Sequence, residues 1–372
     1  MSNHHANSSD FSSNAASIQR LGWDNAPRQM AFSAWINQQI HTYGLDLNSL
    51  SHASADASFR RYFRIASANA TFIVMDAPPD KENCQPFVDI ATLLMNAGVR
   101  VPRILSWDTA LGFMLLDDLG QHTMMQHLSD GSDSKPLAMF EQAIDTLLSV
   151  QTVKPPDWLG TYDDALLRRE LGLFEDWYIQ SHLNVSLTAS QEQQLHAVYD
   201  RLVSCNLAAP TVFVHRDFMP RNLMVSDDGH QAGLGVLDFQ DAVHGPITYD
   251  IASLMRDAFI SWDEDFCLDI TVRYWHKARA AGLLDFEDWH SDFGAFYRAV
   301  EWMGLQRHLK VAGIFARLTL RDHKPKYLAD TPRFIHYIRS TASRYRELFP
   351  LLRLLDDLEG TAPVSAYSFG RL

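Results

Sequence analysis

Two short segments, HRDFMPRN at residues 215–222 and LDF at residues 237–239, decide the fold of this 372-residue chain. An apolar run typical of a β-strand leads into each segment. Asp217 and Asn222 belong to the first segment, and Asp238 follows Asp217 by 21 positions in the second. That interval has room for a loop, a strand, a turn and a returning strand, so we expect the three side chains to converge on one point.

The chemistry of these three residues points to phosphoryl transfer. Two carboxylates and one amide carbonyl, without a His or Cys ligand, are hard oxygen donors that suit Mg²⁺ bound together with substrate phosphates. One carboxylate can bind the metal while the other accepts the proton of an attacking hydroxyl. The order H-R-D-x-x-x-x-N followed by D-F is also the signature of the protein-kinase-like fold. The alternative is a polar β-hairpin in an unrelated fold.

Upstream of these segments, the pattern is that of a small α+β unit. Apolar residues recur at helical spacing in AFSAWINQQI, residues 31–40. Two β-rich runs within residues 51–79, separated by a short polar turn, predict a hairpin. PFVDIATLLMNAGV, residues 86–99, predicts a helix, and two further strands are expected within residues 101–119.

Downstream, the chain is mostly helical around the short β-rich island that carries HRDFMPRN. Helices are predicted at 136–151, 162–182, 190–206, 249–260, 264–281, 289–312 and 332–358. The predicted fold class is therefore α+β, a two-lobed protein-kinase-like fold. We expect a flexible N-terminal tail at residues 1–29, a small N-lobe with a β-sheet at 30–118, and a larger, mainly helical C-lobe at 119–372.

Composition excludes several classes of function. The chain has 32 Lys and Arg residues and 45 Asp and Glu residues, so its formal net charge is −13. This negative charge disfavours binding to nucleic acid or to an anionic membrane surface. The three cysteines are far apart and form no C-x-x-C pair, so a disulfide framework is not expected. The sequence predicts neither an export signal nor a membrane span. We therefore expect a cytoplasmic protein.

Longer strings carry a resemblance to a known family. From about residue 30 to residue 360 the chain resembles the aminoglycoside phosphotransferase and choline kinase branch of the kinase-like fold. Within that branch it is most similar to the anomeric kinases of N-acetylmuramate and N-acetylglucosamine in bacterial cell-wall recycling. The strings that carry this likeness are DASFRRYFRI, FIVMDAPPD, HRDFMPRNLMV, LDFQDAVHGPITYDIASLMRDA and LQRHLKVAGIFARL.

The resemblance implies roles for the residues of the catalytic segments. Asp217 is expected to be the catalytic base, and Asn222 and Asp238 are expected to bind Mg²⁺. His215 is expected to brace the catalytic loop. Asp250, in TYDIASL, resembles the aspartate that begins the following helix and accepts hydrogen bonds from the backbone of that loop.

The chain departs from the family pattern where the nucleotide phosphates are expected. There is no glycine between Gly44 and Gly98, so small residues from Ser54 to Ser58 must cover the phosphates in place of a glycine-containing loop. The resemblance also implies that backbone groups between Leu116 and Leu119, in the connection between the lobes, meet the adenine of ATP.

A second departure concerns a lysine that the family places on the strand after this loop. The first lysine of the chain is Lys81, which lies beyond that strand, and the strand residues 72–75 are apolar. We hypothesise that Arg64 or Arg61 replaces the lysine, because a guanidinium group matches phosphate geometry. The alternative, that both are surface arginines, stays open.

The acceptor site is expected from two further groups of polar residues. One is the pair Arg256 and Asp257, for which a structural ion pair on a helix is the alternative. The other is the polar group of the helix at residues 289–312, for which a solvated helix face is the alternative: Trp302, Gln306, Arg307, His308 and Lys310.

The resemblance therefore implies an ATP-dependent sugar kinase that uses Mg²⁺ and acts on a small amino sugar, with no obligate protein partner. One alternative is a kinase for an aminoglycoside, choline or a related alcohol. Another is a pseudokinase that binds nucleotide and serves as a scaffold, because the usual lysine is missing. A protein kinase is disfavoured because no A-P-E element follows the D-F segment.

Overall fold

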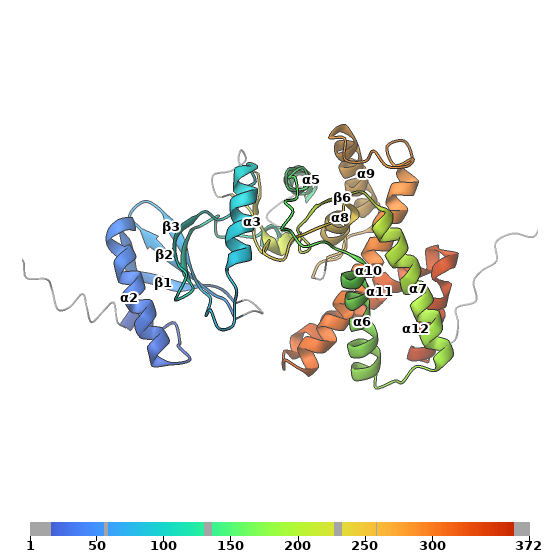
Figure 1. The fold of residues 1–372 in the computed structure, drawn as a ribbon, viewed down its shortest axis with the longest axis horizontal. Coiled ribbons are helices and arrows are strands. Elements are labelled where there is room, and N and C mark those ends of the chain that lie inside the picture. The colour runs from blue at the N-terminus through green and yellow to red at the C-terminus, as the bar shows by residue number, and fades with distance from the viewer. Residues whose placement is uncertain (1–15, 56–58, 130–135, 227–232, 258, 361–372) are drawn as a thin grey trace, which may run out of the picture. The chain divides into compact units, whose positions relative to one another are not determined.

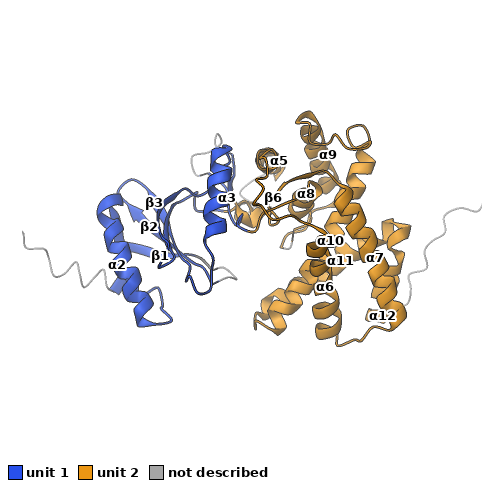
Figure 2. Cartoon of the chain, viewed as in Figure 1, with its two compact units in different colours: residues 1–122, 224–240 blue, residues 123–223, 241–372 orange. Residues whose placement is uncertain are grey.

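The computed structural model describes residues 16–55, 59–129, 136–226, 233–257 and 259–360. The chain divides into two compact units (Figure 2). The first comprises residues 1–122 and 224–240, and the second comprises residues 123–223 and 241–372. A sheet-bearing unit and a mainly helical unit agree with the predicted α+β class.

The first unit is built on a five-stranded antiparallel sheet (Figure 1). In spatial order its strands are β1 (Leu45–Ala55), β2 (Arg61–Ser67), β3 (Thr71–Asp76), β5 (Phe113–Asp117) and β4 (Ile104–Asp108). The predicted hairpin is β2–β3. The run predicted as its first arm contains parts of two strands, because β1 turns back and pairs with β2 from Leu45 opposite Ser67 to Ala55 opposite Arg61.

Helix α2 (Ala26–Tyr43) covers one face of this sheet (Figure 1). Its buried residues Phe32, Trp35 and Ile36 pack with Phe63 of β2 and its neighbours. Asn25 accepts a hydrogen bond from the Arg28 N–H and caps the helix, and Gly44 ends it in the left-handed conformation with φ 63°. The apolar spacing in residues 31–40 therefore marked a real helix.

Part of the segment expected to be a tail contributes to this core. Ile18 and Leu21 are buried in the same hydrophobic cluster, and Trp23 packs against it. The Trp23 indole N–H donates to the Ile18 carbonyl at 2.8 Å. Residues 1–15 of the expected tail lie outside the described part of the chain.

Helix α3 (Gln85–Asn96) also belongs to the first unit and begins with Pro86 in its first turn. Its N-terminal region carries Phe87, whose ring stacks on Phe239 with centroids 5.0 Å apart. Segment 224–240 joins the first unit through such contacts, and the Val236 N–H donates to the Arg100 carbonyl at 2.8 Å. The residues after β8 (Gly235–Val236) are thereby held within the sheet-bearing unit.

The second unit consists mainly of helices packed around α10 (Phe293–Leu320), which is buried along most of its length. A π-helix (Phe174–His182), α6, α8 and α11 all pack against α10. The remaining helix bounds are α4 (Met124–Ser129), α5 (Pro136–Gln151), α6 (Asp164–Leu173), α7 (Ala189–Ala208), α8 (Thr248–Met255), α9 (Glu264–Ala280), α11 (Thr331–Arg344) and α12 (Phe349–Glu359).

The predicted β-rich island forms two small sheets. Strand β6 (Thr211–Val214) pairs antiparallel with β9 (Val243–Pro246), and β7 (Leu223–Met224) pairs with β8. Short 3₁₀ turns lie at Pro220–Asn222, Pro325–Asp330 and Arg346–Leu348. The strand that enters HRDFMPRN is thus paired with β9, and the strand that leaves it is paired with β8.

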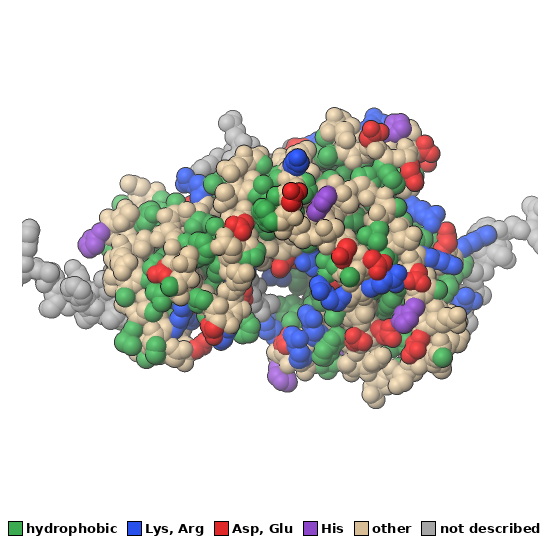
Figure 3. Space-filling view, viewed as in Figure 1, with side chains coloured by type: hydrophobic (Ala, Val, Ile, Leu, Met, Phe, Trp, Pro, Cys, Tyr) green, Lys and Arg blue, Asp and Glu red, His purple; other side chains and the backbone are tan. Residues whose placement is uncertain are grey.

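The surface of the helical unit carries charged side chains of both signs. On the face drawn in Figure 3, basic side chains are interspersed with acidic ones over the helical unit. Among the helices of the described residues, none has the length and apolar character that a membrane crossing requires.

Candidate active site

The backbone of the loop that carries HRDFMPRN, residues 215–222, is anchored to a buried aspartate. One carboxylate oxygen of Asp250 accepts a hydrogen bond from the His215 N–H at 2.7 Å, and the other accepts one from the Arg216 N–H at 3.0 Å. This is the contact that the family resemblance implies for Asp250. Arg216 has φ 74°, a left-handed conformation that is costly for a side-chain-bearing residue. The two hydrogen bonds to Asp250 help to hold it.

Burial has a large effect on the Asp250 carboxyl group. Desolvation of this fully buried group raises its pKa to about 7, although the two backbone N–H donors lower it. The Asp217 carboxylate raises it further, and the Arg307 guanidinium lowers it. Asp250 therefore acts from within the protein and supports the loop rather than the substrate.

Asp217 and Asn222 are joined by the loop itself. The side-chain amide of Asn222 donates to the Asp217 carbonyl at 2.8 Å, and the Asp217 N–H donates to His215 Nδ1 at 3.2 Å. The Asn222 N–H donates to the Met219 carbonyl at 2.9 Å in the 3₁₀ turn. Because its nitrogen is anchored to the Asp217 carbonyl, the Asn222 amide presents its oxygen on the opposite side.

Asp238 belongs to the first unit and follows β8 directly. It has φ 64°, which is the left-handed region, and one of its carboxylate oxygens accepts a hydrogen bond from the Gln240 side chain at 2.8 Å. The next residue, Phe239, is fully buried and stacks on Phe87. Asp238 is therefore held at the end of a strand in a strained conformation, as is common for functional residues.

Sequence reasoning missed a buried charged cluster behind the loop. The Glu170 carboxylate of α6 accepts a hydrogen bond from Arg216 Nη2 at 2.6 Å and lies 3.0 Å from Lys310 Nζ of α10. Tyr162 also donates to it. The signal was available, because Glu170 falls three residues after the buried Leu167 on the apolar face of its helix.

Arg61 lies on the face of the sheet that α2 covers. Its neighbours by strand alternation, including Phe63, are buried beneath that helix. Arg61 Nε donates to the fully buried Asp76 at 2.9 Å, and its guanidinium lies 4.3 Å from the Trp23 ring centroid. Arg28 of α2 binds the same carboxylate, with its Nε 3.0 Å from Asp76. These contacts give Arg61 a structural role.

Arg64 lies on the opposite face of β2. Its guanidinium makes a two-pronged ion pair with Asp118, at 2.6 Å and 3.1 Å, and donates to the Gly120 carbonyl at 2.8 Å. Across the ladder it stands opposite Ile73 of β3, the strand where the family lysine is missing. Of the two arginines, Arg64 is therefore the one on the face that α2 does not cover.

Of the other residues predicted for the nucleotide site, Leu116 and Leu119 are buried. Leu116 lies within β5, paired with Ile73 of β3 and Ile104 of β4. The Leu119 carbonyl accepts a hydrogen bond from Arg100 at 2.8 Å. The backbone of Ser54 belongs to β1, but its side chain and all of Ser58 lie outside the described part of the structure.

Three of the residues predicted for the acceptor site are buried and bound to the protein. Gln306 donates to the Leu167 carbonyl at 2.9 Å, and Arg307, which is 2% exposed, donates to the Arg256 carbonyl at 3.3 Å. Asp257 is also buried and accepts a hydrogen bond from the Phe259 N–H at 3.2 Å. The alternative of a solvated helix face is therefore wrong for Gln306 and Arg307.

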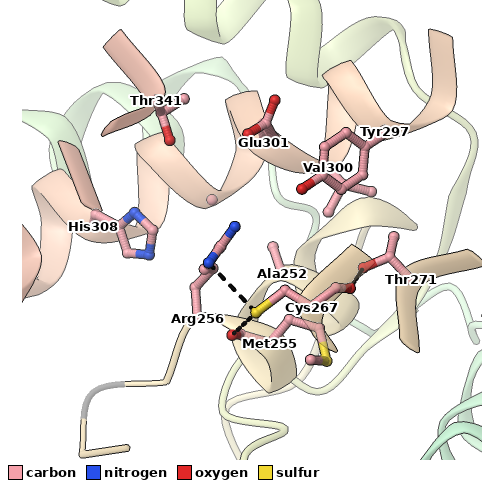
Figure 4. A pocket seen from close by; sticks show the side chains of 11 residues that line it. Ala252, Met255, Arg256, Cys267, Thr271, Tyr297, Val300, Glu301, His308 and Thr341 are labelled. Carbon is pink, nitrogen blue, oxygen red and sulfur yellow. Dashed lines mark hydrogen bonds between the residues drawn. The ribbon is translucent and has the colours of Figure 1, made fainter. Parts of the chain in front are cut away.

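Arg256 and His308 line a small cavity in the second unit (Figure 4). Arg256 projects toward the Cys267 thiol and forms an ion pair with Glu264 at 2.6 Å. Burial, with the adjacent Arg307 and Arg256 guanidinium groups, lowers the pKa of His308 well below its usual range. The cavity measures about 20 Å³, so it has room for a water molecule but not for a sugar ring.

In a comparison with known proteins, the chain is similar to kinases that share one name. It is 49% identical to the N-acetylmuramate/N-acetylglucosamine kinase of Pseudomonas aeruginosa, over 82% of this chain and 87% of that protein. It is 45% identical to the protein of the same name from Pseudomonas putida, over 90% of this chain and 98% of the relative.

A solved structure supports the predicted fold. Plasmodium vivax ethanolamine kinase superposes with a TM-score of 0.59 at 10% identity, covering 91% of this chain and 99% of the kinase. At that identity the likeness concerns the fold alone, and it confirms the protein-kinase-like class. Residues 49–290 match the model of the "Phosphotransferase enzyme family". This match covers more than half of the chain, and the chain therefore belongs to this phosphotransferase family.

Proposed function

We propose that this chain is an ATP- and Mg²⁺-dependent kinase that phosphorylates the anomeric hydroxyl of N-acetylmuramate, N-acetylglucosamine or both in peptidoglycan recycling. The observation that carries the proposal is its identity of 45–49% to kinases named for these two sugars, over most of both chains. The catalytic loop anchored on Asp250 supports an active enzyme rather than a scaffold.

In the proposed reaction, Asp217 is the general base. Its carboxylate accepts the proton of the anomeric hydroxyl as that oxygen forms a bond to the γ-phosphorus. The bond between the γ-phosphorus and the bridging oxygen breaks, and ADP leaves with the electron pair. The hydrogen bonds of Asp217 to His215 and Asn222 support this role, because they hold the loop backbone in place during proton transfer.

Asn222 and Asp238 are the proposed Mg²⁺ ligands. An amide oxygen and a carboxylate fit a hard divalent cation that is shared with substrate phosphates. The Asn222 amide supports this assignment, because its nitrogen is anchored to the Asp217 carbonyl and its oxygen faces away. The assignment of Asp238 rests on its order in the sequence and on the family resemblance. Bound Mg²⁺ would neutralise phosphate charge during transfer.

Arg64 is the proposed replacement for the missing strand lysine. Its two-pronged pairing with Asp118 supports this role, because the same fork of donors matches a phosphate group. The backbone near Leu119 is proposed to meet the adenine, and the segment from Ser54 to Ser58 is proposed to cover the phosphates.

For the acceptor, Arg256 is the strongest of the predicted contacts. It is 18% exposed, whereas Asp257, Gln306, Arg307 and His308 are nearly or fully buried. We propose that Arg256 meets a carboxylate or acetamido oxygen of the sugar. The four buried residues are proposed to support its position.

The test is ADP release with a panel of acceptors, followed by phosphorus NMR of the product. The panel holds N-acetylmuramate, N-acetylglucosamine, choline, an aminoglycoside and a blank without acceptor. We expect turnover with one or both N-acetyl sugars and a resonance of an anomeric phosphate. Asp217→Asn is the matched control, because it keeps the size of the side chain and removes the base.

Other outcomes would replace the proposal. Turnover with choline or the aminoglycoside alone would assign the chain to another small-molecule kinase. ATP binding without turnover on any acceptor would favour a nucleotide-binding scaffold. A phosphate on the primary hydroxyl of the sugar would keep a sugar kinase but overturn the anomeric assignment.

A further inference from the structure

The loop that carries HRDFMPRN contains two arginines, and only one of them is paired with an acid in the described part of the chain. Arg216 pairs with the buried Glu170 carboxylate at 2.6 Å. Arg221 is half-buried, and its guanidinium lies over the ring of Phe259, 4.8 Å from the centroid. Among the described residues, no carboxylate forms an ion pair with Arg221. Its charge is therefore available to an anion from outside these residues.

The contact between Arg221 and Phe259 leaves the hydrogen-bonding groups of the arginine available. A cation over an aromatic face is held by the charge distribution of the ring, which occupies no N–H donor. The guanidinium has five such donors, arranged as a fork that matches a planar carboxylate. In the part of the structure that is described, none of them binds a protein acceptor.

Phe259 is held in place from two sides. Its N–H donates to the buried Asp257 carboxylate at 3.2 Å, and its ring packs against Phe315 of α10, with centroids 6.3 Å apart. Phe315 is buried and packs in turn against Phe334 of α11 at 5.2 Å. Phe259 therefore offers Arg221 a fixed support, and the predicted acceptor residue Asp257 holds the backbone of that support.

Arg221 also lies close to the proposed base along the chain. It follows Asp217 by four residues in the same loop, which the Asn222 side chain closes through its hydrogen bond to the Asp217 carbonyl. A group bound by Arg221 is therefore expected near the hydroxyl that Asp217 deprotonates. In N-acetylmuramate, a lactyl carboxylate is attached to the same sugar ring as the anomeric hydroxyl. N-acetylglucosamine lacks this carboxylate.

The other arginine proposed for the acceptor differs in the compensation of its charge. Arg256 pairs with Glu264 at 2.6 Å, and Glu264 also lies 3.0 Å from Arg344. A substrate carboxylate bound to Arg256 would meet the carboxylate of Glu264, which repels it. Arg256 is therefore better suited to a neutral acetamido oxygen, and Arg221 is better suited to a carboxylate.

We propose that Arg221 is a specificity-determining residue of the acceptor site, whose guanidinium binds the carboxylate of N-acetylmuramate while Phe259 supports it. The proposal rests on the proposed sugar kinase function, and it adds the ligand group that distinguishes the two candidate acceptors. The enzyme is accordingly expected to favour the acidic sugar over the neutral one.

The test compares N-acetylmuramate with its carboxamide, which has a similar size and no charge. Calorimetric titration of the enzyme with each sugar, without nucleotide, gives two dissociation constants. We expect the wild type to bind the acid about 10- to 100-fold more tightly than the amide. In Arg221→Met, the two constants are expected to agree within about threefold. Arg221→Lys should retain part of the preference, because it keeps the charge but loses the fork of donors.

Two further variants separate this effect from damage to the fold. Phe259→Leu keeps the arginine and removes the ring beneath it, so the preference for the acid should fall in part. Arg353→Met removes an exposed positive charge from α12 of the same unit and is the matched control, for which we expect the wild-type ratio. If Arg221→Met does not fold, Arg221→Lys and Phe259→Leu still test the direction of the change.

Steady-state kinetics give a second readout. Arg221→Met is expected to raise the KM for N-acetylmuramate by about tenfold or more, with smaller effects on kcat and on the KM for ATP. An equal loss of kcat with the acid, the amide and N-acetylglucosamine would mean that Arg221 acts on the transferred phosphoryl group, which would overturn the proposal.

The binding data also separate this proposal from the proposed function. The carboxylate site is wrong if the wild type binds neither sugar or binds both equally. It is also wrong if Arg256→Met loses the preference while Arg221→Met keeps it. A wild type that prefers the acid through Arg221 but phosphorylates neither N-acetyl sugar would support the carboxylate site and contradict the sugar kinase function.

Discussion

The Asn222 side chain donates a hydrogen bond to the backbone carbonyl of Asp217, across 2.8 Å. The two residues are five positions apart, and the 3₁₀ turn at Pro220–Asn222 closes the distance between them. The contact uses the nitrogen end of the amide, so the orientation of Asn222 depends on the backbone of the proposed base. Changes at either residue are therefore expected to affect both proton transfer and metal binding.

Asn222→Leu tests this coupling. The variant keeps a similar shape but loses both the donor to Asp217 and the proposed metal ligand. We expect kcat to fall by at least about 100-fold and half-saturation by Mg²⁺ to require a higher concentration. The measurement is steady-state kinetics over a Mg²⁺ series. Met219→Leu, a substitution of similar volume in the same loop, is the control, and unchanged Mg²⁺ dependence in Asn222→Leu would exclude the proposed ligand.

Arg64→Met and Arg61→Met test the roles of two arginines that lie on opposite faces of the sheet. Arg64→Met should raise the KM for ATP by about tenfold or more, because it removes the proposed phosphate cation. Arg61→Met should leave that KM unchanged and lower the free energy of unfolding by about 2 kcal/mol, because the buried Asp76 loses a partner. Equal effects of both variants on the KM would contradict the assignment of Arg64.

Two glycines of α10 predict opposite responses to the same substitution. A Cβ at Gly304 would meet only ordinary contacts, 3.7 Å from His308 and 3.8 Å from Ala252, beside the small cavity. Gly304→Ala should therefore raise the free energy of unfolding by about 0.5–1 kcal/mol. A Cβ at Gly313 would lie 2.2 Å from the Leu173 carbonyl oxygen, so Gly313→Ala should lower it by about 2 kcal/mol or more.

Urea unfolding of both variants at one pH checks these values. The prediction concerns the sign of the change in the free energy of unfolding. The two glycines lie in the same helix and differ in how closely other residues approach them. Destabilisation of similar size in both variants would show that the two positions are equally crowded.

His308 predicts a specific dependence of stability on pH. Its pKa in the folded protein lies well below its usual value, because burial and the neighbouring arginines disfavour the charged ring. Below about pH 6.5 the unfolded chain therefore binds a proton that the native protein does not. The contribution to stability is present above this pH and is lost as the pH falls, by up to about 1.4 kcal/mol per pH unit.

His308→Phe keeps a ring that can stack on Tyr337, whose centroid lies 4.9 Å from the imidazole, and removes the titration. Urea unfolding of both proteins at pH 7.5 and pH 5.5 measures the effect. We expect the wild type to lose more stability than the variant on acidification. Parallel losses would mean that His308 binds protons equally in the folded and unfolded chains.

Several features were determined by the sequence itself, because they depend on contacts between near neighbours in the chain. Helical spacing from Phe32 to Ile40 predicted α2, and the alternation on either side of residues 67–70 predicted β2–β3. The spacing of Asp217 and Asn222 within HRDFMPRN reflects a local turn, which the hydrogen bond between them uses. Such signals need no knowledge of distant partners.

Other features depend on contacts between residues that are far apart in the sequence. Alternation placed Arg61 and Arg64 on opposite faces of β2, but only the packing of α2 shows which face is covered. Lys310 in LQRHLKVAG looks like a surface lysine until α6 brings Glu170 to within 3.0 Å of it, across 140 positions. Which distant charges form pairs depends on how the helices pack against each other. That packing cannot be predicted from a single sequence. The tertiary structure alone decided that Glu170 and Lys310 are buried and that each is the other's partner.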